Sequence, residues 1–334
     1  MSRTVIVTGG AGYIGSHACK ALAAAGYTPV CYDSLATGNR WAIKWGPFER
    51  GDVLDPARIH EVFLAHRPVA VMHFAALSLV GESMKLPGLY YRTNVMGTVN
   101  LLDACRVHGV EAFVFSSTAA VYGTPEAMPI PEDCPKNPIN PYGASKLMVE
   151  RVLADYHRGH GIRHMILRYF NAAGADPEGE IGERRDRETH LIPLVLDAIA
   201  ERRDPLTVLG TDYPTPDGTA VRDYIHVSDL VEAHVRALGR LLDGAESRVM
   251  NLGTGRGFSV KEVMAAAERV TGKPVPHSIG KRRGGDPTAL VANAEAARAF
   301  LGDDLTQRSS IEAIVGTAWA WQSSEFYDQV YFRG

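Results

Sequence analysis

The stretch "TVIVTGGAGYIGSH" (residues 4–17) decides how the rest of the chain is interpreted. A short β-branched run leads into Gly10-x-Gly12-x-x-Gly15, equally Gly9-x-x-Gly12-x-x-Gly15, and a helical pattern follows. Glycines at this spacing allow a tight turn and a close backbone approach to a pyrophosphate, which the N–H groups at the helix start bind. The alternative is a plain structural turn. The context of strand, glycines and helix favours a dinucleotide site.

An acidic residue at the end of the next expected strand supports this interpretation. Asp33 closes the strand expected at 28–33, and it follows Gly15 at close to the spacing of about 20 residues known for an acid that binds the adenosine ribose. A carboxylate there repels a 2′-phosphate. The expected cofactor is therefore NAD and not NADP.

The composition bounds the class of protein. With 334 residues, 46% hydrophobic and 22% charged, the chain is one large domain or two intimate ones of an ordinary globular protein. A formal net charge of −3 gives no nucleic-acid or membrane signature. No apolar run approaches the ~20 residues of a membrane span. The immediate strand leaves no room for a signal peptide, and the scattered cysteines suit a reducing compartment, so a cytoplasmic protein is expected.

The first half alternates β-branched runs with helical stretches, which predicts an α/β fold with a doubly wound parallel sheet of the Rossmann type. The expected helix at 13–25 ends at Gly26. The second half predicts a smaller α/β substrate-binding domain, with a capping box of Ser259 and Glu262. Residues 1–175 and 176–334 are the expected domains, with chain crossings between them. The expected strands are 4–9, 28–33, 47–52, 69–76, 111–117 and 164–171, with 206–209 and 248–252 in the smaller domain.

A tyrosine and a lysine lie one helical turn apart in "PYGASKLMVE" (141–150). Tyr142 and Lys146 can face the same ligand, and a fixed positive charge favours the phenolate. Lowering the pKa of a phenol from about 10 to about 7 takes roughly 4 kcal/mol of preferential stabilisation of the phenolate. Upstream, "FVFSSTAAVYG" (113–123) ends a strand in Ser116, Ser117 and Thr118, at the sheet edge where ligands bind. Such a tyrosine–lysine pair could act as a general base, but an isolated pair is more often a surface contact, so the rest of the chain has to decide between the two.

With the glycine loop, these residues resemble the extended short-chain dehydrogenase/reductase family, in which a Tyr-x-x-x-Lys pair and an upstream hydroxyl act on a substrate held against the nicotinamide. "HFAALSLVGES", "RYFNAAGADP", "DYPTPDGTAVRDYIHV" and "KRRGGDP" are similar to the nucleotide-sugar 4-epimerases of that family, over nearly the whole chain. The resemblance implies an NAD-dependent isomerase that interconverts UDP-galactose and UDP-glucose. The sugar is oxidised at C4 to a 4-keto intermediate, and hydride returns to its opposite face.

The resemblance also implies the roles of individual residues. Tyr142 would be the base, Lys146 would bind the nicotinamide ribose and lower the pKa of Tyr142, and Thr118 would share their hydrogen bonds. The implied cofactor contacts are Gly9, Gly12, Tyr13, Ile14, Gly15, Asp33, Ser34, Asp52, Val53, Phe74, Ala75, Ala76, Asn94, Ser116, Tyr142, Lys146 and Phe170. The implied UDP-sugar contacts are Thr118, Tyr142, Asn171, His190, Leu191, Leu209, Arg222, Arg283 and Asp286. Arginines suit the diphosphate. A homodimer through the helices starting near Asn94 and Tyr142 is implied as well.

Three positions depart from the family pattern. Ser78 replaces a lysine near the cofactor in some members, and His190 replaces an asparagine, where a core histidine is the alternative. Leu290 falls where residue size relates to N-acetylated sugars, and a leucine favours the UDP-glucose and UDP-galactose pair.

Other enzymes and one other class stay open. A UDP-pentose or UDP-N-acetylhexosamine 4-epimerase would use the same residues, and a non-catalytic NAD-sensing protein could share the scaffold. A 4,6-dehydratase is disfavoured, because Ala119 and Ala120 follow Thr118 where an acid pair would be needed. No metal site is predicted. Both "ERRDRE" (183–188) and the histidines 157, 160 and 164 are expected to be solvated.

Overall fold

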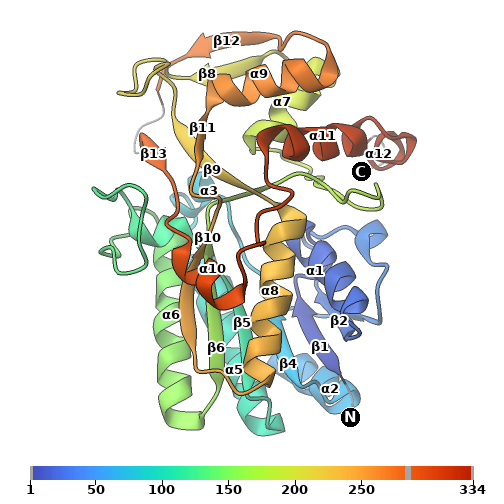
Figure 1. The fold of residues 1–334 in the computed structure, drawn as a ribbon. Coiled ribbons are helices and arrows are strands. Elements are labelled where there is room, and N and C mark those ends of the chain that lie inside the picture. Colours follow the sequence, from blue (N-terminus) through green and yellow to red (C-terminus); the bar gives the residue numbers. More distant parts are fainter. Residues whose placement is uncertain (1–2, 283–286, 332–334) are drawn as a thin grey trace.

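The computed structural model describes residues 3–282 and 287–331, arranged as a large and a small part stacked one above the other (Figure 1). Within these residues the large part contains a seven-stranded parallel sheet in the order β10-β6-β5-β4-β1-β2-β3. Its strands are β1 (Thr4–Thr8), β2 (Thr28–Asp33), β3 (Phe48–Arg50), β4 (Ala70–His73), β5 (Ala112–Thr118), β6 (Arg163–Tyr169) and β10 (Arg248–Leu252). The predicted doubly wound Rossmann sheet is confirmed, and the strand ends lie within three residues of those predicted.

Helices cover both faces of this sheet. On one face lie α1 (Tyr13–Ala24), α8 (Val227–Leu242) and α10 (Glu295–Leu301), where Leu22 and Leu238 are fully buried against the strands. On the other face lie α2 (Pro56–His66), α5 (Gly97–His108) and α6 (Pro141–His160), where Phe63, Leu101 and Leu153 are buried. Because both faces are covered, the middle of several strands is a continuous apolar run and not an alternating one, as in Val5–Val7 and Phe113–Phe115.

Strand β10 differs from the prediction. The segment 248–252 was expected to serve the smaller domain, but it pairs in parallel with β6 at the edge of the main sheet. The helix before it, α8, packs against α1. The prediction that 248–252 belongs to the smaller domain was wrong, because a short apolar run indicates a strand but not which strand it pairs with.

The smaller part lies over the carboxyl ends of the main strands (Figure 1). Its strands are β7 (Asn171–Ala173), β8 (Leu206–Leu209), β9 (Val221–His226), β11 (Gly257–Ser259), β12 (His277–Gly280) and β13 (Ala289–Leu290), and its helices are α7 (Leu191–Ile199), α9 (Val260–Thr271), α11 (Ile311–Gln322) and α12 (Glu325–Tyr331). Val195, Val263 and Ile314 are buried in their common core. The predicted capping box of Ser259 and Glu262 opens α9 and is confirmed. The boundary at residue 175 stays a prediction.

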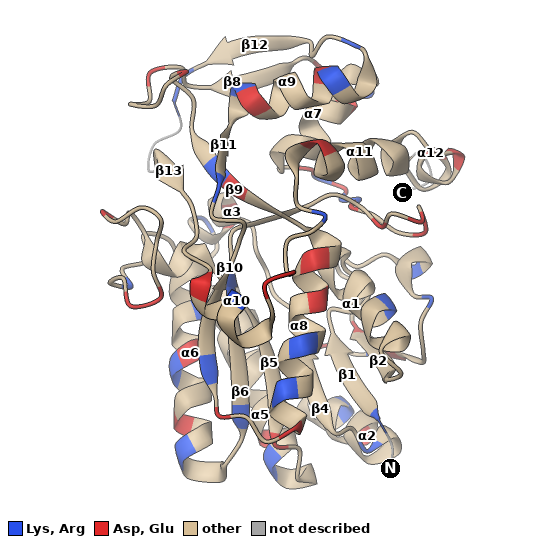
Figure 2. Cartoon of the chain, in the orientation of Figure 1, with Lys and Arg blue, Asp and Glu red and all other residues tan. Residues whose placement is uncertain are grey.

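Short helices complete the fold between β4 and α5: α3 (Val80–Ser83), α4 (Pro87–Tyr90) and a π-helix at Tyr91–Met96. Charged residues of both signs lie along α6 and α8 (Figure 2). No helix within the described residues is both long and apolar enough to cross a membrane. One local expectation was wrong: His164 is buried in β6, 6% exposed, and not part of a solvated surface.

Candidate active site

The glycine loop between β1 and α1 forms a cradle that side chains would fill. Gly9 has a φ of +72°, and a Cβ there would lie 2.7 Å from the Ala75 nitrogen. A Cβ on Gly15 would lie 2.0 Å from the Gly9 oxygen. Gly12 precedes α1 and has no side chain that could cap it, so the first-turn N–H groups stay available to an anion. The loop therefore fits a pyrophosphate.

The Asp33 carboxylate lies beside this loop at the end of β2. Its two oxygens accept hydrogen bonds from the Ala11 nitrogen at 3.0 Å and the Leu35 nitrogen at 2.8 Å. Burial raises the pKa of Asp33, and these two bonds act in the opposite direction. A Cβ on Gly38 would lie 2.8 Å from the carboxylate, so this glycine keeps space open next to it. The arrangement fits the ribose hydroxyls of an adenosine.

Other residues implied for the cofactor follow neighbouring strand ends. Asp52 and Val53 come after β3, and Phe74 to Ala76 come after β4, so both groups follow the carboxyl ends of parallel strands. Ser34 follows β2, Ile14 packs on the core under α1, and Phe170 packs beside Tyr122 after β6. Ser78 is exposed.

Asn94 is buried and hydrogen-bonded to protein groups on two sides of the site, and its contact with the cofactor stays a prediction. It is 2% exposed, and its amide bonds to Leu77 in both directions, at 2.9 and 3.0 Å. The amide also donates to the Ser145 hydroxyl at 2.9 Å. Asn94 thus joins the loop after β4 to α6, and so supports both walls of the site.

The predicted catalytic residues come together where β5 ends and α6 begins. Asn140 caps α6 by accepting from the Gly143 nitrogen at 2.8 Å, which places Tyr142 in the first turn. A side-chain hydrogen bond joins Tyr142 to Thr118, the last residue of β5. The Lys146 Nζ atom donates to the Ser116 carbonyl oxygen at 2.9 Å. The side chain of Ser116 is bonded to the Tyr169 hydroxyl.

Burial has the largest effect on the pKa values of this pair. Burial raises the pKa of Tyr142, while the bond to Thr118 and the charge of Arg185 lower it. Burial also lowers the pKa of Lys146 to about 7, against the charge of Glu150. In the protein alone, burial outweighs the hydrogen bond and the arginine charge, so the pKa of Tyr142 lies above its ordinary value; a lowering of this pKa by Lys146 stays a prediction.

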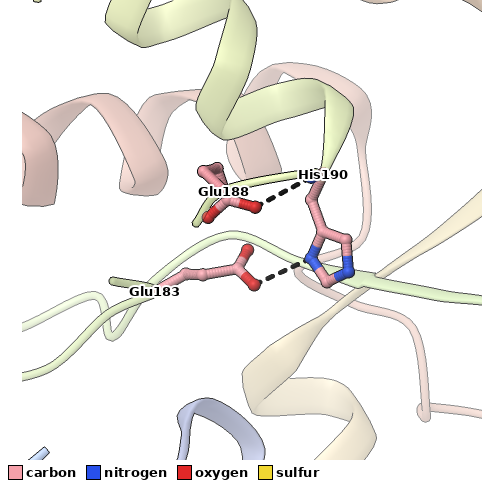
Figure 3. Close-up of side chains that lie close together, drawn as sticks. All are labelled: Glu183, Glu188 and His190. Carbon is pink, nitrogen blue, oxygen red and sulfur yellow. Dashed lines mark hydrogen bonds and ion pairs between the residues drawn. The ribbon is translucent and has the colours of Figure 1, made fainter. Parts of the chain in front are cut away.

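The loop before α7 contains a cluster of charges that sequence reasoning treated as solvated (Figure 3). Glu183 is only 5% exposed, and one of its oxygens accepts from His190 Nδ1 at 2.8 Å and Arg185 Nε at 2.9 Å. Trp321 donates to the Glu183 carbonyl at 3.1 Å. Glu188 accepts from the His190 backbone nitrogen at 2.8 Å. The prediction of a solvated loop was wrong for Glu183, because the loop is held against α11. The same loop brings Arg185 near Tyr142.

The residues implied for the UDP-sugar lie on the small sheet and its surroundings. Asn171 is paired with Tyr224, and Leu290 with Arg222, so Asn171, Arg222 and Leu290 share one face of the sheet around β9. His190 precedes α7, Leu191 begins it, and Leu209 ends β8 with 40% exposure. Arg283 and Asp286 lie outside the described residues.

A buried polar network beneath the site was not predicted. Glu150 and Arg168 form an ion pair with both side chains almost fully buried. Ser117 donates to Glu150 at 2.6 Å, and Arg168 donates to the Tyr122 hydroxyl at 2.9 Å. One signal in the sequence could have pointed to Glu150, which follows Lys146 by one further helical turn and so lies on the same helix face.

Two groups of acidic residues could suggest a metal ion, but each already holds a cation. Lys20 lies 2.6 to 2.8 Å from Asp176, Glu178 and Glu180. The group around Glu183 contains Arg185 and His190. Both are ion-pair clusters in which these cations occupy the carboxylate oxygens.

Comparison with known families matches this geometry. A model of the NAD dependent epimerase/dehydratase family matches residues 5–253. The chain belongs to that family. The matched residues of the epimerase/dehydratase family include β10, so they span the complete main sheet together with the Tyr142 and Lys146 pair.

Individual members of the family are similar over nearly the full length. A UDP-glucose 4-epimerase of Rhizobium meliloti is 52% identical over 322 residues, 96% of this chain and 98% of that protein. The crystal structure of UDP-glucose 4-epimerase from Brucella ovis in complex with NAD is 51% identical, with a TM-score of 0.92 over 95% of this chain and 97% of that one. The enzyme from Bifidobacterium longum, in complex with NAD⁺ and UDP, is 38% identical with a TM-score of 0.90, covering 96% and 98% of the chains.

Proposed function

We propose that this protein is an NAD-dependent UDP-glucose 4-epimerase that interconverts UDP-galactose and UDP-glucose. The observation that carries the proposal is the position of Tyr142, bonded to Thr118 at the end of β5 and one turn from Lys146. Tyr142 and Lys146 lie near the carboxyl ends of the parallel strands, where the glycine loop and Asp33 also lie. Near-full-length identity of 52% to a protein of this name supports the same activity.

The side chains divide the work as follows. Tyr142 takes the proton from the 4-hydroxyl of the sugar, and Thr118 hydrogen bonds to the phenol and favours its ionised form. Lys146 binds the nicotinamide ribose, and Asp33 binds the adenosine ribose. NAD held there would supply the acceptor for the hydride from C4 of the sugar and, as NADH, the donor that restores a hydride to the opposite face of the 4-keto sugar. Arg222, with Asn171 beside it and Arg283 from outside the described residues, binds the diphosphate.

The redox balance explains why a chain would enclose its cofactor. Oxidation and reduction occur in the same turnover, so NAD stays bound and no second substrate is consumed. The sugar has to turn over between the two hydride transfers, which requires firm contacts at the nucleotide and few at the hexose. The arginines and the small sheet supply the firm contacts at the nucleotide.

The test uses purified protein with no added cofactor. UDP-galactose is incubated with the protein and UDP-glucose is measured by chromatography, with UDP-N-acetylgalactosamine and UDP-arabinose in parallel. Conversion of UDP-galactose alone supports the epimerase and retained NAD. Conversion of only an N-acetyl or pentose sugar moves the substrate and keeps the mechanism. No turnover even with NAD added would favour a non-catalytic NAD-sensing protein.

We further propose a cytoplasmic homodimer. The helices that begin near Asn94 and Tyr142 carry Met96, Val107 and Met148, which are 51%, 56% and 48% exposed. Large apolar side chains at this exposure suit a partner surface. Light scattering coupled to size exclusion should give twice the chain mass for the wild type and the chain mass for Met148→Glu. A monomeric wild type would contradict the proposal.

A further inference from the structure

Glu150 makes contacts that connect both parts of the catalytic pair. It lies one helical turn after Lys146 on α6, so the two side chains are neighbours on one face of the helix. Both are buried, with 7% and 3% of their surface exposed. Glu150 Oε1 accepts from the Ser117 hydroxyl at 2.6 Å. Ser117 lies between Ser116, whose carbonyl binds Lys146, and Thr118, which binds Tyr142.

The groups that face Lys146 and Glu150 come from three strands and one helix. Strand β5 offers the Ser116 carbonyl and the Phe115 ring, whose centre lies 4.8 Å from Lys146 Nζ. From β4, burial and then the charge of Lys146 lower the pKa of His73 to about 3, so this ring is neutral at physiological pH.

The remaining groups are on β6 and on α6 itself. Arg168 on β6 donates from Nε to Glu150 Oε1 at 2.9 Å and from Nη2 to the second oxygen. Tyr169, also on β6, has a pKa that burial raises, so it is a neutral phenol. On α6, Tyr142 is the reacting group. Glu150 is therefore the anion that faces Lys146 among the residues that the structure describes.

We propose that Glu150 is a positioning residue for the epimerase reaction: its carboxylate holds the end of β5 through Ser117 and keeps the neighbouring Lys146 ammonium charged inside a desolvated site. A neutral lysine would lose the positive charge that favours the Tyr142 phenolate. The inference rests on the proposed function. It assigns Arg168 a different part, which is to pair with the buried Glu150 carboxylate.

Three variants separate the charge of Glu150 from its packing. Glu150→Gln keeps the shape and removes the charge. Glu150→Asp keeps the charge and shortens the side chain. Arg168→Lys keeps both charges but loses the two-pronged contact and the bond to Tyr122, so it is a matched control for damage to the network. All measurements are made well below the unfolding temperature of each variant.

The first readout does not need turnover. NMR of ¹³C-labelled lysine follows the titration of Lys146 in the free protein, with Lys146→Arg identifying its signal. Glu150→Gln should lower the pKa of Lys146 by about one unit or more, since removal of an opposite charge nearby has effects of this size. Glu150→Asp and Arg168→Lys should leave it near the wild-type value, although Arg168→Lys lowers Tm.

The second readout is the pH dependence of kcat with UDP-galactose. The alkaline loss of activity should move to lower pH in Glu150→Gln and return in Glu150→Asp. An unchanged Lys146 titration in Glu150→Gln would overturn the inference, and so would an equal shift in Arg168→Lys, which would mean packing alone. A wild type that converts no UDP-sugar refutes the proposed function instead, and the NMR titration still decides the role of Glu150.

Discussion

The Tyr13 hydroxyl donates to the carbonyl oxygen of Gly174 at 2.7 Å. Tyr13 begins α1 directly after the glycine loop, and Gly174 follows β7 of the small sheet. One hydrogen bond therefore ties the cofactor loop to the part of the chain that holds the UDP-sugar contacts. The phenol side chain binds protein here, which leaves the backbone of the loop for NAD.

Tyr13→Phe should lower stability and leave the cofactor in place. Removing the hydroxyl leaves the Gly174 carbonyl without this donor, which costs about 1 to 3 kcal/mol. Urea unfolding measures the loss, and the absorbance of NAD released by acid gives the occupancy. A variant that loses NAD while keeping wild-type stability would assign the hydroxyl to the cofactor instead.

Tyr142→Phe should keep NAD and UDP-sugar binding and lose turnover by about 100-fold or more, the contribution of a general base. The rate of UDP-galactose conversion and the NAD content give the two quantities. Tyr156→Phe on the same helix removes a hydroxyl that bonds to Asp103 at 3.0 Å, away from the site, and should stay active. Near-wild-type turnover in Tyr142→Phe would remove this residue from the role of base.

Gly15→Ala should disrupt the loop, because the new methyl would lie 2.0 Å from the Gly9 carbonyl oxygen, a backbone atom. We expect a loss of about 1 to 3 kcal/mol and lower NAD content. The matched control is Gly316→Ala in α11, where nothing lies within 4 Å of the new Cβ. That change should stabilise by about 0.5 to 1 kcal/mol. Equal behaviour of the two variants in denaturant would contradict the close-approach argument.

The ion pair of His190 and Glu183 should give a pH-dependent stability. The charge of Glu183 raises the pKa of His190 although desolvation lowers it, so the stabilisation by the ion pair is complete below about pH 6.5 and is lost as the pH rises through the raised pKa. Burial raises the pKa of Glu183, but His190 and Arg185 together lower it to about 2, so the pair also weakens as the pH falls from about 4.5 toward 2.

His190→Gln tests this pair by thermal unfolding across the pH range. Because the His190 side chain is 44% exposed, the effect should be about 1 kcal/mol or less. The Tm difference from wild type should be largest near pH 5 to 6, where both partners are charged, and should shrink as the pH rises through the raised pKa of His190. The same difference measured in a Glu183→Gln background should vanish. A difference independent of pH would exclude the ion pair as its source.

Leu290→Ala should widen the range of sugars. Leu290 is paired with Arg222 across β13 and β9 and packs beside Tyr122, on the face that also carries Asn171. A smaller side chain should raise the rate with UDP-N-acetylgalactosamine relative to that with UDP-galactose. The ratio of the two rates is its own control for partial loss of folding. An unchanged ratio would separate this position from sugar selection.

The parts of the fold that follow from local pattern were predictable. β-branched runs marked β1 to β6, and the glycine spacing marked the turn into α1, because each signal lies within a few adjacent residues. The position of β10 could not be read in this way, since strand pairing across the chain leaves no local pattern.

The candidate site shows the same division. Tyr142 and Lys146 were identified from their spacing together with the family resemblance, which also implied the role of Thr118, and the structure brings the three residues together. The burial of Glu183 was missed, because a run of charges indicates solvent exposure and nothing in that run shows that Trp321 of α11 lies against it. The raised pKa of Tyr142 was missed for a related reason: desolvation depends on all surrounding elements.

The edge position of β10 has a consequence for synthesis of the protein. A nascent chain that has emerged as far as residue 175 contains β6 but not its outer partner, and the apolar surface that α8 later covers is open. The seven-stranded sheet cannot be completed until residue 252 has left the ribosome. Until then the growing chain presents an unpaired strand edge, which is a template for aggregation, so folding of this protein should depend on how quickly translation delivers that late strand.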